Sequence, residues 1–266
     1  MADESPISPT ARQTIERKLT EIETAESVRI IFAIESGSRA WGFPSPDSDY
    51  DVRFVYVRKP DWYLSIDPRR DVIELPIDGD FDVNGWDLRK ALQLLIKSNP
   101  VLLEWLSSPI VYRADHDAMR RLKELGHRTA YFKPSLFHYL HLCTSQYGRF
   151  IRDKEKVQLK KYFYCLRPAL ALMWLRTNAG RSVPMSLNEL RAGLELPKDL
   201  SAFFDVLLER KRVTKELGTG PRNAALDDFI EHEMELAREN AGTPPPVQPS
   251  ILDEANALFR ELVGAA

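Results

Sequence analysis

Two acidic residues, Asp49 and Asp51, stand two positions apart at the start of an apolar, β-branched run, and Gly37–Ser38 lies about ten residues before them. Side chains at positions i and i+2 of a strand point to the same face. Two carboxylates on one face repel each other unless a cation lies between them. Mg²⁺ takes hard oxygen ligands and usually bridges to substrate phosphates. The pair therefore predicts a site for Mg²⁺ or Mn²⁺.

The Gly37–Ser38 turn has the chemistry of a phosphate-binding segment. Glycine lets the backbone approach a ligand closely, and the hydroxyl and amide of Ser38 can donate to a phosphate oxygen. Arg39 and Arg53 flank the two halves of the motif, where each can contact a triphosphate, support the carboxylates or form a structural ion pair. Glu35 directly precedes the turn and is able to orient amides of the loop. One end of the motif is thus predicted to hold a nucleoside triphosphate and the other its metal.

A third carboxylate is expected from the segment 78–87. Asp82 lies between Phe81 and Val83, which is typical of a strand residue that faces a site. Asp80 has the same parity but lies nearer a turn, so it remains the alternative third acid. Asp87 precedes a run with helical periodicity and is predicted to cap a helix. Three converging acids would serve as metal ligands and catalytic groups, and two divalent metals could then activate the attacking oxygen and stabilise pyrophosphate.

A second group of candidate residues lies in the helical half. The segment 146–176 holds eight basic and two acidic residues, a net charge of +6 in a chain whose net charge is −2. Lys160, Tyr164 and Arg167 follow helical spacing and Lys161 adjoins them, so they are predicted to form one polar face that binds the phosphates of the nucleotide. A solvated basic face is the alternative.

The Gly-Ser turn, the spacer and the Asp-x-Asp pair resemble the signature of the nucleotidyltransferase superfamily typified by DNA polymerase β. The string 35–54 is similar to the narrower YcgL/RlaP type of bacterial nucleotidyltransferase, some members of which accompany RNA-repair genes. The similarity continues through 84–91, 103–110 and 160–168. It implies the superfamily fold and transfer of a nucleoside monophosphate from an NTP to a hydroxyl, with release of pyrophosphate.

The acceptor is not fixed by this resemblance, because one fold serves many substrates. An RNA end is favoured through the link to RNA repair. A protein hydroxyl, as in a protein adenylyltransferase, is an alternative within the enzymes. An antitoxin or a regulatory binding module is the alternative outside them, and the intact Asp49/Asp51 pair argues against it because dead members usually lose an acid.

The composition indicates an ordinary globular enzyme. The chain has 266 residues, of which 44% are hydrophobic and 29% charged, so a disordered chain is excluded. No apolar run approaches the roughly 20 residues that span a bilayer. The N-terminus lacks the basic and apolar segments of a secretory signal, and Cys143 and Cys165 lie in apolar helical contexts, as expected of buried free thiols. A cytoplasmic location without membrane association is expected.

The pattern predicts an α+β fold, in which a small mixed β-sheet nucleotidyltransferase core precedes a C-terminal helical bundle. We predict a catalytic domain over 1–114, a helical domain over 115–242, and a Pro-rich linker with a last helix over 243–266. The expected strands are 28–35, 50–58, 72–75, 80–84 and 110–112. Helices are expected at 12–24, 87–97, from 100, and at 115–126, 134–152, 156–179, 186–194, 198–212, 222–240 and 250–263.

Overall fold

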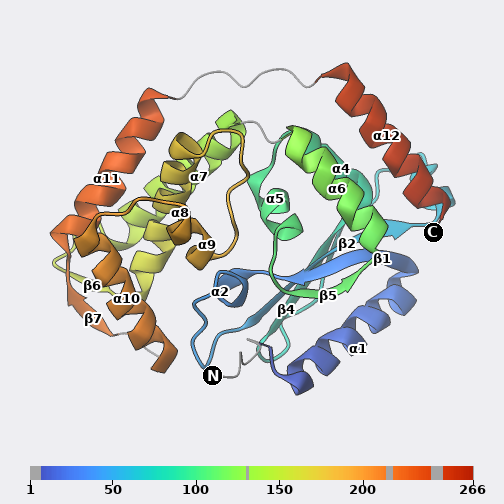
Figure 1. The fold of residues 1–266 in the computed structure, drawn as a ribbon. Helices are drawn as coiled ribbons and strands as arrows, with labels where there is room; N and C mark the ends of the chain where they lie inside the picture. Colours follow the sequence, from blue (N-terminus) through green and yellow to red (C-terminus); the bar gives the residue numbers. More distant parts are fainter. Residues whose placement is uncertain (1–6, 130–131, 214–217, 241–247, 266) are drawn as a thin grey trace. The chain divides into compact units, whose positions relative to one another are not determined.

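A computed structural model describes residues 7–129, 132–213, 218–240 and 248–265 (Figure 1). Its main sheet has five strands in the order β3-β4-β2-β1-β5. β4 runs parallel to β2, whereas the other neighbouring pairs are antiparallel, so the sheet is mixed and the predicted α+β class is confirmed. The strands are β1 (Val28–Glu35), β2 (Tyr50–Arg58), β3 (Val72–Glu74), β4 (Phe81–Asp87) and β5 (Val111–Ala114).

The central strand β2 buries side chains on both faces of the sheet. Val52, Phe54 and Tyr56 belong to one apolar cluster, and Val55 and Val57 belong to another. This division follows the two-residue period of a strand, in which successive side chains point to opposite faces. A strand that is covered on both faces reads as a continuous apolar run, which is why the sequence predicts its bounds well.

Helices cover both faces of this sheet. α1 (Pro9–Glu26) begins after the cap residue Ser8 and buries Ile15, Leu19 and Ile22, the stripe that its helical periodicity predicts. The apolar cluster on the other face of the sheet contains residues from several helices, including the last helix of the chain. The helices of this half are α1, α2 (Gly37–Ala40), α3 (Pro60–Tyr63), α4 (Leu88–Ile96), α5 (Pro100–Leu106), α6 (His116–Thr129) and α12 (Pro249–Gly264).

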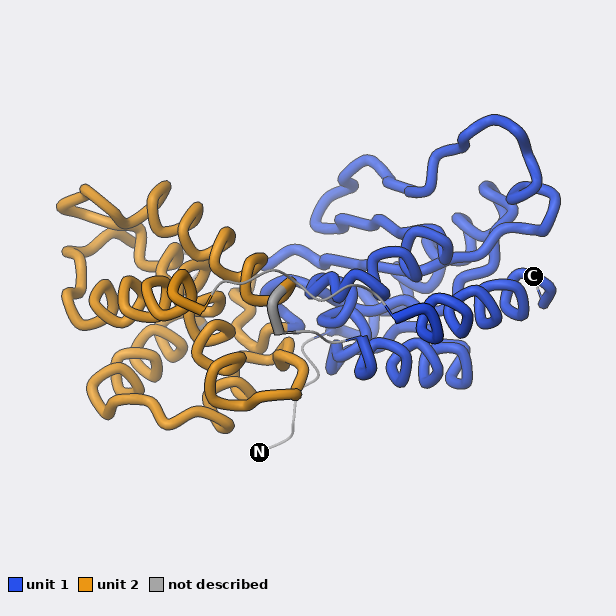
Figure 2. Tube along the Cα trace, turned by 90° about the horizontal axis from the view of Figure 1, so that it is seen from above, with its two compact units in different colours: residues 1–40, 48–129, 246–266 blue, residues 41–47, 130–245 orange. Residues whose placement is uncertain are grey.

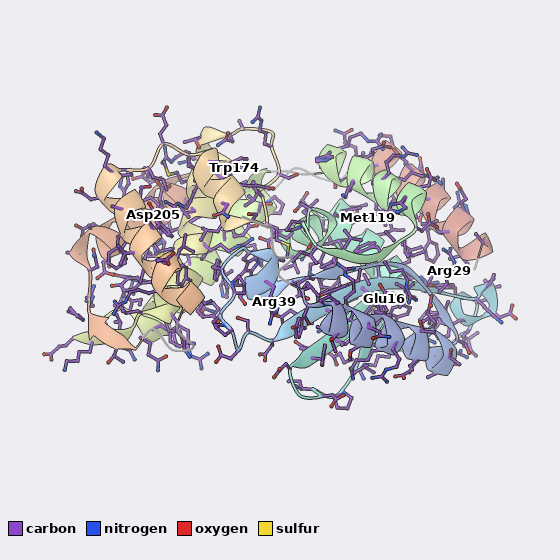
Figure 3. All side chains as sticks on the ribbon, turned by 60° about the horizontal axis from the view of Figure 1, so that its bottom comes forward. Glu16, Arg29, Arg39, Met119, Trp174 and Asp205 are labelled. Carbon is purple, nitrogen blue, oxygen red and sulfur yellow. The ribbon has the colours of Figure 1, made fainter. Side chains whose placement is uncertain are left out.

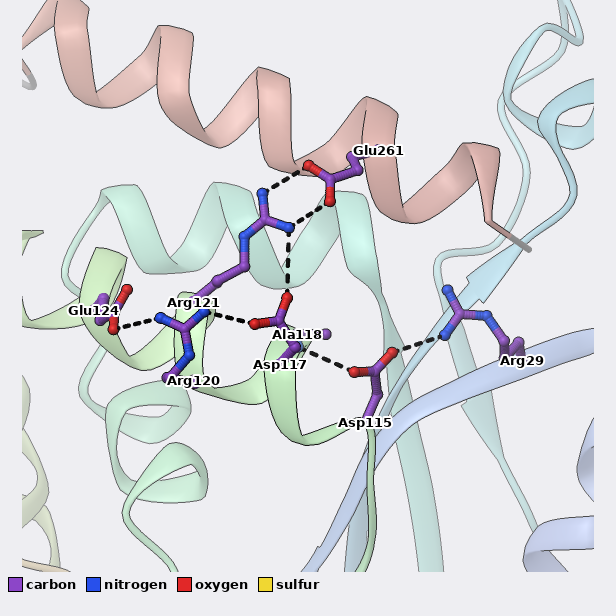
Figure 4. Close-up of polar contacts among 8 residues, drawn as sticks. All are labelled: Arg29, Asp115, Asp117, Ala118, Arg120, Arg121, Glu124 and Glu261. Atoms are coloured by element: carbon purple, nitrogen blue, oxygen red, sulfur yellow. Dashed lines mark hydrogen bonds and ion pairs between the residues drawn. The ribbon is translucent and has the colours of Figure 1, made fainter.

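The last helix, α12, packs against α4 and α6. Leu258 and Leu262 are buried in the same cluster as the apolar residues of those helices. At the surface, Arg121 binds Glu261 with both guanidinium nitrogens, at 2.5 and 2.7 Å (Figure 4). Arg29 donates to the main-chain oxygen of Leu262 at 3.1 Å. α12 is thus part of the packed structure around the sheet.

The remaining helices form a third apolar cluster. α8 (Lys160–Thr177) lies at its centre, with α7 (Phe132–Phe150) and α11 (Ala224–Glu239) packed on it. The other elements of this half are a short β6–β7 ribbon and two more helices. These are β6 (Lys156–Gln158), α9 (Leu187–Ala192), α10 (Lys198–Val213) and β7 (Thr219–Pro221). The predicted helix at 156–179 therefore starts at Lys160, because 156–158 pairs with β7 as a strand.

The chain divides into two compact units, coloured in Figure 2. The sheet unit comprises 1–40, 48–129 and 246–266, and the helical unit comprises 41–47 and 130–245. α6 packs in the apolar cluster of the sheet unit, and that unit extends to residue 129, whereas the predicted domain boundary lies at 115. The last helix belongs to the sheet unit instead of standing apart, and residues 41–47 belong to the helical unit although they lie within the sequence motif.

In the described part of the chain, Cys143 and Cys165 are both free and buried, as predicted. None of the helices described is long and apolar enough to cross a bilayer.

Candidate functional site

Asp51 and Asp82 lie side by side at the start of neighbouring parallel strands. They are register partners in the β2–β4 ladder. Arg53 lies between them: its Nη2 donates to Asp51 Oδ1 at 3.1 Å and to Asp82 Oδ2 at 2.7 Å. Arg53 has the same parity in β2 as Asp51, and therefore faces the same side of the sheet. The sequence left three roles open for Arg53, and the structure shows one of them: Arg53 supports the two carboxylates by hydrogen bonding to both.

Asp49 and Asp80 lie just outside the strands. β2 begins at Tyr50, as predicted, so Asp49 lies one residue before the strand, and its side chain is exposed. Asp80 is also exposed, in the turn before β4, where its carbonyl accepts from the Tyr50 amide at 2.7 Å. Asp82, by contrast, is half-buried beside Asp51. This placement favours Asp82 as the third acid, and its role stays a prediction.

The electrostatics of Asp51 are those of a crowded carboxylate. Burial raises the pKa of Asp51 above its usual range, the carboxylates of Asp82 and Asp49 raise it further, and the Arg53 guanidinium opposes them. Within the described residues, no three His, Cys, Asp or Glu side chains are arranged to hold a metal ion. The oxygen-only donor set nevertheless suits a hard divalent cation, because a cation would relieve the mutual repulsion of these carboxylates.

Gly37 is required by the position of the Asp51 side chain. Its φ is +60°, and a Cβ at this position would lie 1.9 Å from Asp51 Oδ2. Any larger residue would therefore be strained in its backbone and would displace the carboxylate. The next residue, Ser38, makes a hydroxyl–hydroxyl hydrogen bond of 3.0 Å with Ser48. The Gly-Ser turn is thus in direct contact with the acid-bearing segment, although the motif halves are ten residues apart.

Glu35 holds the main chain of Asp51 in place. This fully buried carboxylate accepts from the Asp51 amide at 3.0 Å and from the Tyr112 hydroxyl at 2.5 Å. Burial raises the pKa of Glu35 to about 7, against the opposing effect of the Tyr112 hydrogen bond. Glu35 thus orients a backbone amide of β2, that of Asp51. Tyr112 escaped the sequence analysis, because no local pattern links β5 to the motif.

Arg39, labelled in Figure 3, extends from α2 and contacts the segment before β2. Its Nε donates to the Asp49 carbonyl at 3.1 Å and its Nη2 to the Ser48 carbonyl at 2.6 Å. The guanidinium also stacks on Tyr50, 4.0 Å from the ring centroid. These contacts orient the acid-bearing loop. Binding of the nucleotide by Arg39 stays a prediction.

The cationic residues of α8 do not form a single polar face. Arg167 is buried, donates to the Met185 carbonyl at 3.1 Å and lies 4.8 Å from the Trp41 ring centroid. Its predicted place on an exposed face is therefore wrong, because Arg167 lies on the side of α8 that faces the apolar cluster. Lys160 and Lys161 are half-buried, and Tyr164 is exposed.

Residues 41–47, which we call the spacer loop, are held by aromatic contacts in the helical unit. Phe43 stacks on Phe163 with ring centroids 4.7 Å apart. Lys211 Nζ lies 4.5 Å from the Phe43 centroid, and burial lowers the pKa of Lys211 to about 8, with Asp47 opposing and Lys160 adding to that shift. Sequence analysis missed Lys211, since nothing near it in α10 marks a contact with the motif.

Known proteins are similar to this chain over nearly its whole length. Protein YcgL from Bacillus subtilis (strain 168) is 44% identical over 254 residues, which cover 95% of this chain and 96% of YcgL. A crystal structure of a nucleotidyltransferase-like protein from Exiguobacterium sibiricum 255-15 aligns with 96% of this chain and 80% of its own, at 14% identity. Its TM-score of 0.31 is too low for the two folds to be compared in detail.

Residues 11–261 match the family described as RlaP, the RNA repair pathway DNA polymerase beta family. That range contains the Gly-Ser turn, all three candidate acids and most of both compact units. With a match over nearly its whole length, the chain belongs to this DNA polymerase β-type family and is an enzyme of the nucleotidyltransferase class.

Proposed function

We propose that this protein transfers a nucleoside monophosphate from an NTP to a hydroxyl at an RNA end, in a reaction that depends on Mg²⁺ or Mn²⁺. The single observation that carries the proposal is the pairing of Asp51 with Asp82 in register on parallel strands, directly beside Gly37. An oxygen of the acceptor attacks the α-phosphorus, and the bond from that phosphorus to the bridging oxygen breaks. Pyrophosphate leaves, and the acceptor hydroxyl loses its proton.

Asp49, Asp51 and Asp82 would hold the metal. When bound, the ion neutralises phosphate charge and lowers the pKa of the acceptor hydroxyl. Gly37 leaves room for the substrate next to Asp51, and the Ser38 hydroxyl donates to a phosphate oxygen. Arg53 and Glu35 keep Asp51 in place through its carboxylate and its amide respectively. Preorganised groups of this kind contribute to catalysis because they need not reorganise during the reaction.

The helical unit is proposed to bind phosphate as well. Lys160 would contact the triphosphate, as its type and position predict. Arg167 would act differently, because it is buried under Trp41 and would stabilise the spacer loop instead of touching a phosphate. An RNA acceptor is favoured by the family description, which names an RNA repair pathway. A protein acceptor would place the label on protein, and a binding module would transfer no label.

A transfer assay tests this proposal. Each α-labelled NTP is incubated with the protein and Mg²⁺ or Mn²⁺, with tRNA, nicked RNA or cell lysate as acceptor. We expect labelled RNA from the wild type and none from Asp51→Asn or Asp82→Asn. Asp80→Asn should retain transfer, and Asp61→Asn, an exposed acid on α3, is the neutral control. Undiminished transfer by Asp51→Asn would refute the carboxylate mechanism, and label on protein alone would refute the RNA acceptor.

A further inference from the structure

A strip of positive charge crosses the surface of the helical unit where α7 ends and α8 begins. It consists of Arg149 at the end of α7, Arg152 and Lys154 in the following turn, Lys156 on β6, and Lys161 in the first turn of α8. We call these five residues the basic strip. Four of them are exposed and Lys161 is half-buried. Tertiary structure joins the strip's two ends, since Lys161 Nζ lies 4.3 Å from the ring centroid of Phe150 in α7.

The cations of the basic strip lack acidic partners in the described part of the chain. None of the five lies within 4 Å of a carboxylate there, although Asp153 and Glu155 belong to the same turn. The sheet unit shows the opposite arrangement: Arg120 pairs with Asp117 and Glu124, as Figure 4 shows. With Asp153 and Glu155 counted, the strip and its turn carry five positive and two negative charges, 5 − 2 = +3, in a chain of net charge −2. The positive electrostatic field of the strip favours the binding of a polyanion.

Aromatic rings are interleaved with these cations. Arg149 lies 5.0 Å from the ring centroid of Phe150, which Lys161 also contacts. Lys161 lies 5.0 Å from the centroid of Tyr164, whose exposed fraction is 39%. Tyr164 thus offers an accessible aromatic face beside the positive charges. Proteins that bind single-stranded nucleic acid combine these two features, because bases stack on the rings while cations follow the backbone.

We infer that the basic strip, with Tyr164, binds a single-stranded segment of RNA. This inference rests on the proposed function, since it assigns a surface to the RNA acceptor. A stacking role for Tyr164 needs unstacked bases, which a duplex does not offer. The strip carries five cations from the end of α7, the following turn, β6 and α8, and a strand with several phosphates offers a partner for each of them. Lys161 and Tyr164 then contact the acceptor strand instead of the NTP.

Binding without catalysis tests the inference. A fluorescent single-stranded RNA is titrated with the full-length protein at several salt concentrations, without NTP or divalent metal. R152A/K156A should bind about tenfold more weakly at low salt, and the slope of log K against log salt should become shallower by about 1.4, or roughly 0.7 for each phosphate that the variant no longer neutralises. The matched control is R181A/K198A, which removes two exposed cations from elsewhere in the helical unit.

Stacking is tested at Tyr164. Tyr164→Ala should weaken RNA binding about fivefold or more, whereas Tyr164→Phe, which keeps the ring, should bind as the wild type does. The Asp51→Asn protein should bind RNA normally, so loss of transfer and loss of RNA binding are separate results. The inference fails if R152A/K156A binds RNA as tightly as R181A/K198A. It also fails if the strip variants lose affinity for NTP alone, or if vesicles of anionic lipid bind the strip in preference to RNA.

Discussion

Gly37 and Gly79 have nearly the same φ angle and differ in their surroundings. Their φ values are +60° and +59°, but a Cβ on Gly37 would strike Asp51 while a Cβ on Gly79 would meet nothing within 4 Å. Backbone strain should cost each alanine variant about 1 kcal/mol of unfolding free energy, and Gly37→Ala should lose more because its Cβ collides with the Asp51 carboxylate. Only Gly37→Ala should also abolish transfer. Urea denaturation measures the unfolding free energy of each variant, and the transfer assay measures its activity. Equal activity in the two variants would show that the contact with Asp51 is unimportant.

Glu35 makes the stability of the fold depend on pH. Burial raises its pKa from the usual 4.5 to about 7, while Tyr112, Asp51 and Arg39 face the same group. The folded chain therefore binds this proton more tightly than the unfolded chain does between pH 4.5 and 7. Unfolding free energy should fall as the pH rises through that window, by up to about 3 kcal/mol. Denaturation in EDTA at about pH 5 and about pH 8, on either side of the folded-state pKa, measures this difference.

Glu35→Gln is the matched variant, because glutamine keeps the acceptor for the Asp51 amide and does not titrate. Its unfolding free energy should change less between these two pH values than that of the wild type. The same pH dependence in both proteins would show that another group titrates in this window.

Local sequence pattern pointed to the candidate site residues that stand in their own strand or turn. Asp51 and Asp82 are each the second acid of an Asp-x-Asp sequence at the start of a strand, and Gly37 marks a tight turn. The bridging role of Arg53 and the support from Tyr112 depended on which strands become neighbours and in what register. Register is set by tertiary packing, so no spacing within the sequence reveals it.

At the scale of single elements, two leucines of α12 test whether its buried apolar face stabilises the fold. Leu258 is 4% exposed on the face packed in the sheet unit, whereas Leu252 on the same helix is 45% exposed. Leu258→Ala should lower the unfolding free energy by about 2–5 kcal/mol, because it leaves a cavity in the packed cluster. Leu252→Ala should change it by less than about 0.5 kcal/mol. Similar losses in both variants, measured by urea denaturation, would contradict the observed orientation of α12.

Element bounds were predictable where burial gives a clear period. The bounds of β1 and β2 agree with the prediction, and Asp87 caps α4 by accepting from the Arg89 amide at 2.8 Å. The β6–β7 ribbon was missed, because its pairing joins segments about 60 residues apart and each strand has only three residues. Such short strands carry too little pattern to distinguish them from the first turn of a helix.

At the scale of the whole molecule, the two units have separate apolar clusters, and α12 contributes to only one of them. A chain that ends at residue 247 should therefore lose protection from hydrogen exchange in α4 and α6. The helical unit should keep its protection in α8, since α12 supplies none of its buried residues. Hydrogen exchange followed by mass spectrometry compares the two. Uniform loss of protection across both units would show that they unfold as one.

The division into units could not be foreseen from composition, because both units are discontinuous in sequence. The spacer loop lies inside the motif yet packs with the helical unit through Phe43. The 243–266 segment reads as a Pro-rich linker and a helix, and most of the linker lies outside the described residues. The sequence of the last helix does not predict its docking surface, because an amphipathic stripe indicates that one face is buried but not which element covers it.

The docking of α12 sets an order of events during synthesis on the ribosome. Domains generally fold as units while the chain emerges from its N-terminal end. Here the strands that carry Asp51 and Asp82 are made early, but the apolar surface of α4 and α6 gains its cover only when α12 has been translated. The helical unit is translated in between. The part of the enzyme that carries the acids is thus begun first and completed last, and a nascent chain passes through a stage in which that apolar surface is open to chaperones.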